Sequence, residues 1–161
     1  MNELVLLLAD ERWTKILGEV LAPRLLPGDV VLLTGDLGAG KTTLVKGLMG
    51  ALDESIDVTS PSFALCHQYD SIPPIAHVDC WRMESESELD ELALDELLDD
   101  GWVAVIEWGE RLGSRYDDRA LHITLTTERD GRAALLVTNC DRWMRELELL
   151  AASSGSIGGS C

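Results

Sequence analysis

The spacing of apolar residues predicts an alternation of strands and helices along most of the chain. Short apolar or alternating runs are typical of strands, and longer segments with apolar residues every three to four positions are typical of helices. The predicted strands cover 3–8, 30–34, 62–69, 75–79, 102–106, 121–126 and 133–138, and the predicted helices cover 10–21, 43–52, 85–100 and 141–151.

This order of elements predicts an α/β domain with a mixed sheet. The run 102–106 is apolar throughout, as expected for a strand inside a parallel core. The segments 62–79 and 121–138 are expected to form hairpins that add antiparallel strands, the second turning at Asp130-Gly131. The length of 161 residues favours one domain, here 1–152, followed by a disordered Ser/Gly-rich tail over 153–161.

Composition narrows the class of protein. The chain has no apolar run of membrane-spanning length and no basic segment before its first apolar run, so we expect a cytoplasmic protein without a signal peptide. Its four cysteines form no C-x-x-C pair and are expected to be free thiols. They are Cys66, Cys80, Cys140 and Cys161.

The protein is strongly acidic. A net charge of −16 opposes direct, tight binding to tRNA or other nucleic acids, which requires a basic surface. Residues 84–100 hold nine acids and no base. This segment could face a basic partner, form a solvated helix face, or reflect adaptation to a salty cytoplasm, and the sequence does not choose among them.

The segment 35–42, GDLGAGKT, fits the phosphate-binding pattern G-x-x-x-x-G-K-[ST]. It lies between a predicted buried strand and the N-terminus of a predicted helix, the end of a helix that binds phosphates. In this motif backbone N–H groups surround a di- or triphosphate, Lys41 reaches the β- and γ-phosphates, and the Thr42 hydroxyl can ligate Mg²⁺. The predicted nucleotide contacts are Gly35, Asp36, Leu37, Gly38, Ala39, Gly40, Lys41, Thr42 and Thr43, and the fold is predicted to be a P-loop NTPase-like three-layer sandwich.

Two acids end predicted strands, Asp79 and Glu107. Ligands of open α/β sheets bind beyond the carboxyl ends of the strands. P-loop enzymes need a carboxylate there to hold Mg²⁺, directly or through water, and often a second group to orient the attacking water. The sequence does not decide which acid touches the metal. His77 shares a strand face with Asp79 and could either orient that acid or act in catalysis.

Three other features have functional and ordinary interpretations. The loop 59–62, TSPS, lies where nucleotide switches carry a hydroxyl that senses the γ-phosphate, and it could also be a simple turn. Arg111, Arg115 and Arg119 could clamp phosphates as lid arginines, although surface positions are favoured. Trp108 follows Glu107 at a strand end and could pack on a ligand or a partner.

Four blocks in this order resemble the TsaE family, the ATPase component of the bacterial machinery that makes threonylcarbamoyladenosine on tRNA. The resemblance spans roughly residues 3–140. The blocks are 35–43, 59–63 (like S-P-T-[FY]), 77–82 (like H-x-D-x-Y-R) and 106–110 (like I-E-W-x-E). Ser62 replaces a threonine and keeps the hydroxyl, whereas Trp81 replaces a tyrosine and loses one.

The resemblance implies ATP and Mg²⁺ as cofactors, with Lys41 as the phosphate ligand, Thr42 and Glu107 as metal ligands, and Asp79 acting through water or in catalysis. It also implies docking onto a heterodimer of two actin-like-fold proteins, which ATP binding and hydrolysis would assemble or reset. Alone, the ATPase would be slow. Further candidate residues are Glu110 and Arg132 for the nucleotide and Thr59, Ser60, Pro61 and Ser62 for a switch-like loop.

Other function classes make different demands on the sequence. A small-molecule kinase or stand-alone NTPase is the enzyme alternative, and the kinase needs an acceptor pocket and usually a lid. A GTP-dependent switch should carry N-K-x-D, which the chain lacks. A nucleotide-binding adaptor without turnover is disfavoured by the presence of both Asp79 and Glu107.

Overall fold

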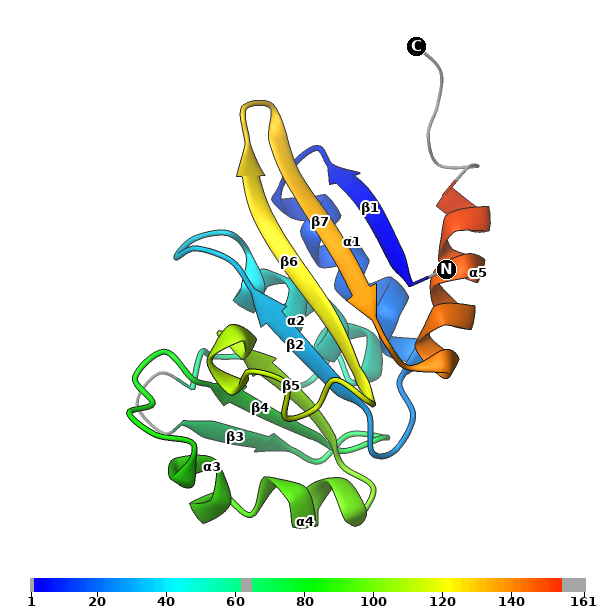
Figure 1. Ribbon diagram of the computed structural model, residues 1–161. Coiled ribbons are helices and arrows are strands. Elements are labelled where there is room, and N and C mark those ends of the chain that lie inside the picture. The colour runs from blue at the N-terminus through cyan, green and yellow to red at the C-terminus, as the bar shows by residue number, and fades with distance from the viewer. Residues whose placement is uncertain (1, 62–64, 155–161) are drawn as a thin grey trace.

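A computed structural model describes residues 2–61 and 65–154 and places seven strands in one sheet (Figure 1). The strands are β1 (Glu3–Leu8), β2 (Val30–Thr34), β3 (Cys66–Tyr69), β4 (Ile75–Asp79), β5 (Val103–Glu107), β6 (Ala120–Glu128) and β7 (Gly131–Thr138). The α-helices are α1 (Glu11–Leu21), α2 (Lys41–Leu52), α3 (Ser87–Glu91), α4 (Leu94–Asp99) and α5 (Asp141–Ser154), and the 3₁₀ helices are η1 (Ala22–Arg24) and η2 (Gly109–Leu112).

The sheet is mixed, as the sequence predicts. Its order is β1-β7-β6-β2-β5-β4-β3. The pairs β6–β2, β2–β5 and β5–β4 are parallel, whereas β3, β7 and β1 join antiparallel to their neighbours. The carboxyl ends of the parallel strands β2, β4 and β5 therefore meet at one edge of the sheet.

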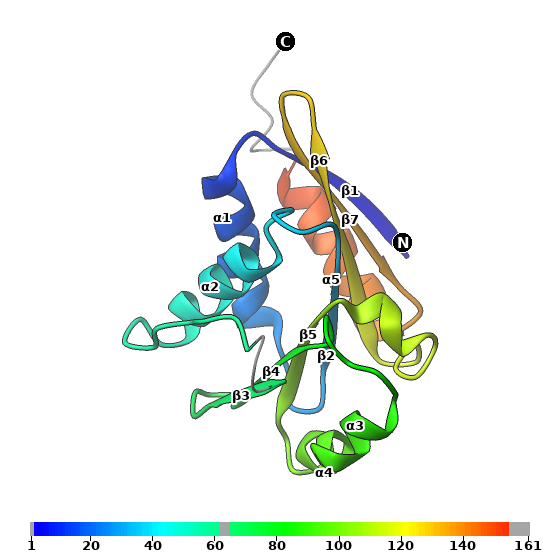
Figure 2. The same cartoon turned by 90° about the vertical axis from the view of Figure 1, so that its left-hand side faces the viewer.

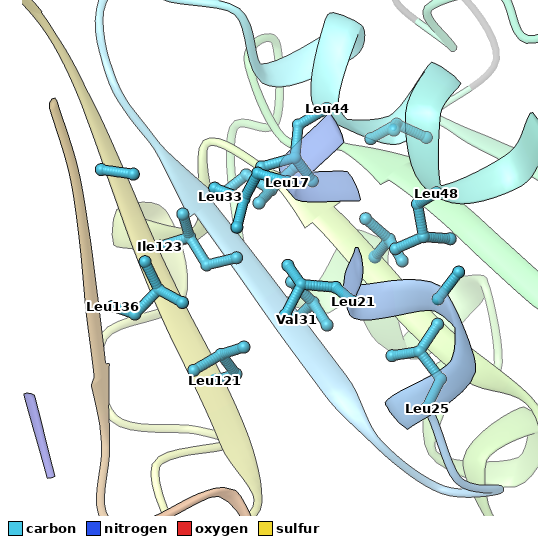
Figure 3. Packing of buried hydrophobic residues seen from close by; sticks show 14 of the residues in the cluster. Leu17, Leu21, Leu25, Val31, Leu33, Leu44, Leu48, Leu121, Ile123 and Leu136 are labelled. Carbon is cyan, nitrogen blue, oxygen red and sulfur yellow. The ribbon is translucent and has the colours of Figure 1, made fainter. Parts of the chain in front are cut away.

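Helices cover both faces of the sheet, so the three-layer prediction is confirmed (Figures 1 and 2). Side chains of β2 alternate between two buried clusters. Val31 and Leu33 pack with residues of α1 and α2 on one face (Figure 3). Residues of α5 belong to the same cluster, and Val30 and Leu32 pack with α3, α4 and η2 on the other face. Burial of β2 on both faces explains its continuous apolar sequence.

The prediction of a single helix over 85–100 is wrong. Two short helices occur instead, α3 and α4. Leu92 and Ala93 separate them, and Ala93 adopts a left-handed conformation with φ of 52°. The break shifts the helical register, so that Leu94 and Leu98 are buried while Ala93 is exposed. An uninterrupted helix would place Ala93 and Leu97 inward and bury less apolar surface.

Other boundaries also differ from the predictions. β3 begins at Cys66, and residues 62–64 of the predicted strand lie outside the described residues. α5 continues to Ser154, two residues into the segment predicted as a tail, of which 155–161 lie outside the described residues. Cys66, Cys80 and Cys140 are free thiols. Within the described part of the chain, no helix combines the length and apolar character needed to cross a membrane.

Two glycines let α1 and α2 pack backbone against backbone. A Cβ atom on Gly47 of α2 would lie 1.9 Å from the carbonyl oxygen of Lys15 in α1. A Cβ atom on Gly18 of α1 would lie 2.1 Å from the carbonyl oxygen of Leu44 in α2. This close crossing fixes α2, whose N-terminus carries the phosphate-binding motif.

Replacing Gly47 with alanine is therefore expected to destabilise the protein by about 1–3 kcal/mol, because the two helices must separate. The effect should appear even though alanine is intrinsically favoured in helices by about 1 kcal/mol. Gly50, in the same helix, is the matched control, since a Cβ atom there meets nothing within 4 Å. Urea unfolding of Gly47→Ala and Gly50→Ala tests this, and equal stabilities of the two variants would refute the packing argument.

Candidate functional site

The phosphate-binding motif forms the turn between β2 and α2. Its last glycine, Gly40, has a φ of 108° and leads directly into the first residue of the helix, Lys41. A residue with a side chain rarely adopts this backbone conformation, and a Cβ atom here would also lie 2.5 Å from Arg132 Nη1. The N-terminus of a 12-residue helix thus opens onto the motif, where its N–H groups favour an anion.

Lys41 is held inside the motif. Its Nζ atom donates hydrogen bonds to the carbonyl oxygens of Gly35 (2.5 Å) and Asp36 (2.9 Å). The same atom lies 4.1 Å from the ring centroid of Trp108, a distance at which a cation–π interaction forms. Burial lowers the pKa of the Lys41 amine, and the negative charge of Glu107 opposes that shift.

Trp108 reaches Lys41 through an unusual backbone conformation. The residue follows β5 directly and has a φ of 61°, which is rare for a bulky side chain and costs of the order of 1–3 kcal/mol. Its indole also packs against Trp81, with ring centroids 4.3 Å apart. The tryptophan that stands where the family pattern has a tyrosine therefore forms an aromatic pair beside the motif.

Glu107 at the end of β5 contacts the motif directly. Thr42 donates its hydroxyl hydrogen to Glu107, with Oγ1 at 2.9 Å from Oε1 and 3.2 Å from Oε2. His77 Nε2 lies 2.9 Å from the same Oε1 atom. Glu107 is 3% exposed, so these contacts offset much of the cost of burying its carboxyl group. His77 contacts Glu107 and not Asp79, which corrects the interpretation that it orients Asp79.

Asp79 ends β4, in register with Glu107 on β5. Its Oδ2 accepts a hydrogen bond from Ser60 Oγ at 3.1 Å, and its Oδ1 accepts one from the backbone N–H of Trp81 at 2.9 Å. The side chain is thus fixed between the loop that follows α2 and the turn that follows β4. The two acids that the sequence singles out lie side by side and have different partners.

Most of the side chains described above line one cavity of about 570 Å³, whereas His77 does not. Arg132, at the start of β7, lines it as well and donates a hydrogen bond to Thr14 Oγ1 at 3.2 Å. Three lining residues were not predicted. Trp81 and Arg82 lie in the block 77–82 and could have been inferred from it, whereas Glu11 carries no signal for a site in the sequence. The complete lining is Glu11, Leu37, Gly38, Gly40, Lys41, Thr42, Thr43, Ser60, Asp79, Trp81, Arg82, Glu107, Trp108 and Arg132.

The other predicted site residues lie elsewhere or act through their backbone. Gly35 and Asp36 contribute the carbonyl groups that hold Lys41, and Ala39 is buried within the loop. Glu110 lies on the exposed side of η2 and is absent from the cavity lining. From the switch-like loop, Ser60 reaches the cavity, Thr59 Oγ1 lies 3.5 Å from His67 Nδ1, Pro61 is buried, and Ser62 lies outside the described residues.

The arginines that could form a lid do not line the cavity. Arg115 Nη2 binds Asp90 and Asp95, at 2.7 and 2.9 Å. Arg111 donates to the carbonyl oxygen of Met83 at 3.2 Å, and Arg119 lies 3.9 Å from Asp118. These contacts agree with the surface interpretation.

The oxygen ligands in the cavity suit a magnesium ion. Thr42 and Glu107 offer hard oxygen ligands 2.9 Å apart, which suits Mg²⁺. Among the described residues, no group of three or more His, Cys, Asp or Glu side chains is arranged to hold a metal by itself. A magnesium ion here therefore needs phosphate oxygens and water as its remaining ligands, as in other phosphate-binding sites.

Comparisons with known proteins agree on one family. A protein-family model described as "Threonylcarbamoyl adenosine biosynthesis protein TsaE" matches residues 8–134. The tRNA threonylcarbamoyladenosine biosynthesis protein TsaE of Mycobacterium bovis is 43% identical over 122 residues, covering 70% of this chain and 72% of that protein. The protein of the same name from Bacillus subtilis is 36% identical over 126 residues, covering 78% of each chain.

A solved structure resembles the whole fold. The crystal structure of Bacillus subtilis YdiB superposes with a TM-score of 0.78 and 28% sequence identity, covering 94% of this chain and 96% of YdiB. The structural similarity thus extends beyond residues 8–134, the part that the family model matches.

Proposed function

This chain belongs to the TsaE family and takes part in tRNA threonylcarbamoyladenosine biosynthesis, in which we propose that it is a cytoplasmic, Mg²⁺-dependent ATPase subunit. The observation that carries the proposal is the convergence of Lys41, Thr42 and Glu107 in one cavity at the N-terminus of α2. A cation, a hydroxyl and a carboxylate at this end of a helix are the groups that bind a nucleoside triphosphate together with Mg²⁺.

Each residue has a separate role in the proposed site. The N–H groups at the start of α2 bind the phosphates, and Lys41 adds a positive charge to them. Thr42 and Glu107 hold the magnesium ion, which neutralises charge on the phosphates when bound. Because Thr42 donates its hydrogen to Glu107, the lone pairs of its oxygen remain available to a cation.

Asp79 is the proposed group that orients the attacking water. It lies in register with Glu107, and its contacts with Ser60 and the Trp81 N–H fix the carboxylate at the cavity wall. The bond to Ser60 also joins this acid to the switch-like loop, so a change in that loop on nucleotide binding would reach the acid directly. Arg132, on the other side of Gly40, is proposed to contact the nucleotide.

The proposed partner is a heterodimer of two actin-like-fold proteins that transfers the threonylcarbamoyl group. ATP binding and hydrolysis by this chain would assemble or reset that complex. Supporting this role, Trp81 is 43% exposed at the cavity mouth, beside Trp108 and Lys41, where a docked protein would cover the nucleotide. The net charge of −16 agrees with a subunit that does not grip tRNA directly.

Reconstituted tRNA modification tests this proposal. The two partner proteins and tRNA are incubated with ATP and the substrates of the reaction, with this chain present or absent. We expect the chain to increase the number of modified tRNA molecules formed per partner heterodimer, and Lys41→Ala to remove the increase. Equal modification with and without the wild-type chain would contradict the proposed role.

A further inference from the structure

His77 is a buried polar residue that has no role in the function proposed above. It lies in the middle of β4, is 0% exposed, and faces the side of the sheet that packs against α2. Its Cα partner on β5 is Val105, and its side chain reaches one step diagonally along β5 to Glu107. His77 is buried and does not line the cavity, so it contacts the acid from within the protein.

The contacts of the imidazole indicate which of its nitrogens donates a hydrogen bond. Nε2 lies 2.9 Å from Glu107 Oε1, and a carboxylate oxygen requires a donor there. Nδ1 has no hydrogen-bond partner among the described residues. A buried N–H without an acceptor costs about 1–3 kcal/mol, so a hydrogen on Nδ1 is disfavoured. The geometry therefore assigns Nε2 as the nitrogen that donates to Glu107.

The two oxygens of Glu107 consequently have different environments. Oε1 accepts hydrogen bonds from both His77 Nε2 and Thr42 Oγ1, at 2.9 Å each. Among the residues that the structure describes, Oε2 has only the longer contact with Thr42, at 3.2 Å. Oε1 is thus occupied by protein donors, and Oε2 is the oxygen with capacity for a further ligand.

We infer that His77 is a positioning residue. Its contact with Oε1 fixes the Glu107 side chain and leaves Oε2 available to the magnesium ion. This inference rests on the proposed function, because it assigns His77 a task within the proposed metal site. Groups that hydrogen-bond to a metal ligand orient it, and their loss typically weakens metal binding by 10- to 100-fold. A purely structural role would instead make His77 replaceable by any side chain that keeps the fold.

The test compares two amide side chains of different length. Glutamine places its N–H₂ group close to the position of the imidazole Nε2, whereas asparagine is too short to reach Glu107. Isothermal titration with ATP, in EDTA and in excess Mg²⁺, gives the gain in affinity that the metal confers. We expect His77→Asn to reduce this gain by about 10- to 100-fold, with affinity in EDTA unchanged, and His77→Gln to retain most of it. The matched control is His122→Asn, at a half-exposed position on β6 that binds Asp117.

The outcomes separate the inference from the proposed function. If the wild-type protein shows no gain in ATP affinity from Mg²⁺, the proposed function fails and the inference fails with it. If the wild type shows the gain and His77→Asn retains it in full, only the inference is overturned. Equal losses in the asparagine and glutamine variants would also overturn it, because the N–H group would then not be the feature that matters.

Nitrogen NMR of the wild-type protein tests the same inference without any variant that might fail to fold. Long-range ¹H–¹⁵N spectra distinguish the two neutral forms of histidine from the protonated one. We expect His77 to carry a hydrogen on Nε2, the nitrogen that contacts Glu107. Absence of a hydrogen on Nε2 would overturn the inference, because the ring could then not donate to Glu107.

Discussion

Replacing Lys41 with alanine is expected to weaken ATP binding by about 10- to 100-fold. The side chain already lies within the phosphate-binding motif, where Gly35 and Asp36 hold its amine. A hydrogen bond to a charged group contributes about 1.5–3 kcal/mol, and each 1.4 kcal/mol changes the dissociation constant tenfold. Isothermal titration of ATP into the wild type and the variant measures the difference.

The control for this prediction is Lys46→Ala. Lys46 lies in the same helix, but its side chain is exposed and does not line the cavity. Its removal changes the net charge by the same amount as Lys41→Ala and should leave ATP affinity unchanged. If Lys41→Ala binds ATP as tightly as the control does, the nucleotide site is assigned to the wrong cavity.

Replacing Glu107 with glutamine is expected to lower the rate of ATP hydrolysis by about 100-fold or more. A metal ion contributes several kcal/mol to stabilising charge in the transition state, and each 1.36 kcal/mol is a tenfold change in rate. Glutamine keeps the size of the side chain and an oxygen that can accept from Thr42, so the fold should be preserved. Phosphate release at saturating ATP and Mg²⁺ measures the effect, and circular dichroism checks the fold.

Asp79→Asn separates the roles of the two acids. If Glu107 holds the metal and Asp79 orients water, Asp79→Asn should slow hydrolysis yet keep the gain in ATP affinity that Mg²⁺ confers. Glu107→Gln should lose both. Full hydrolysis by Glu107→Gln, together with loss of the metal effect in Asp79→Asn, would transfer the metal ligand from Glu107 to Asp79.

Local sequence was sufficient to predict the elements that carry the site. β2 is recognisable because burial on both faces makes its first four positions, 30–33, apolar, and α2 because a P-loop motif precedes it. The positions of Asp79 and Glu107 at strand ends could be predicted as well, since parallel strands place their carboxyl ends together. These features depend on residues close together in the chain.

Features that depend on distant contacts could not be predicted in the same way. The apolar spacing of 85–100 fits one helix, but the opposing sheet face favours burial of Leu94 and Leu98, and the helix breaks at Ala93 to allow it. The partner of His77 depends on the relative register of β4 and β5, which no short motif specifies. The contribution of Trp108 depends on its left-handed backbone conformation, which the sequence does not indicate.

Release of phosphate from ATP and Mg²⁺ by the purified protein, alone and then with the two partner proteins, tests the central claim most directly. We predict slow release by the protein alone and a clear increase when both partners are added, because the partners complete the site. Fast release by the protein alone, or a rate that the partners leave unchanged, would contradict the assignment of a partner-dependent ATPase.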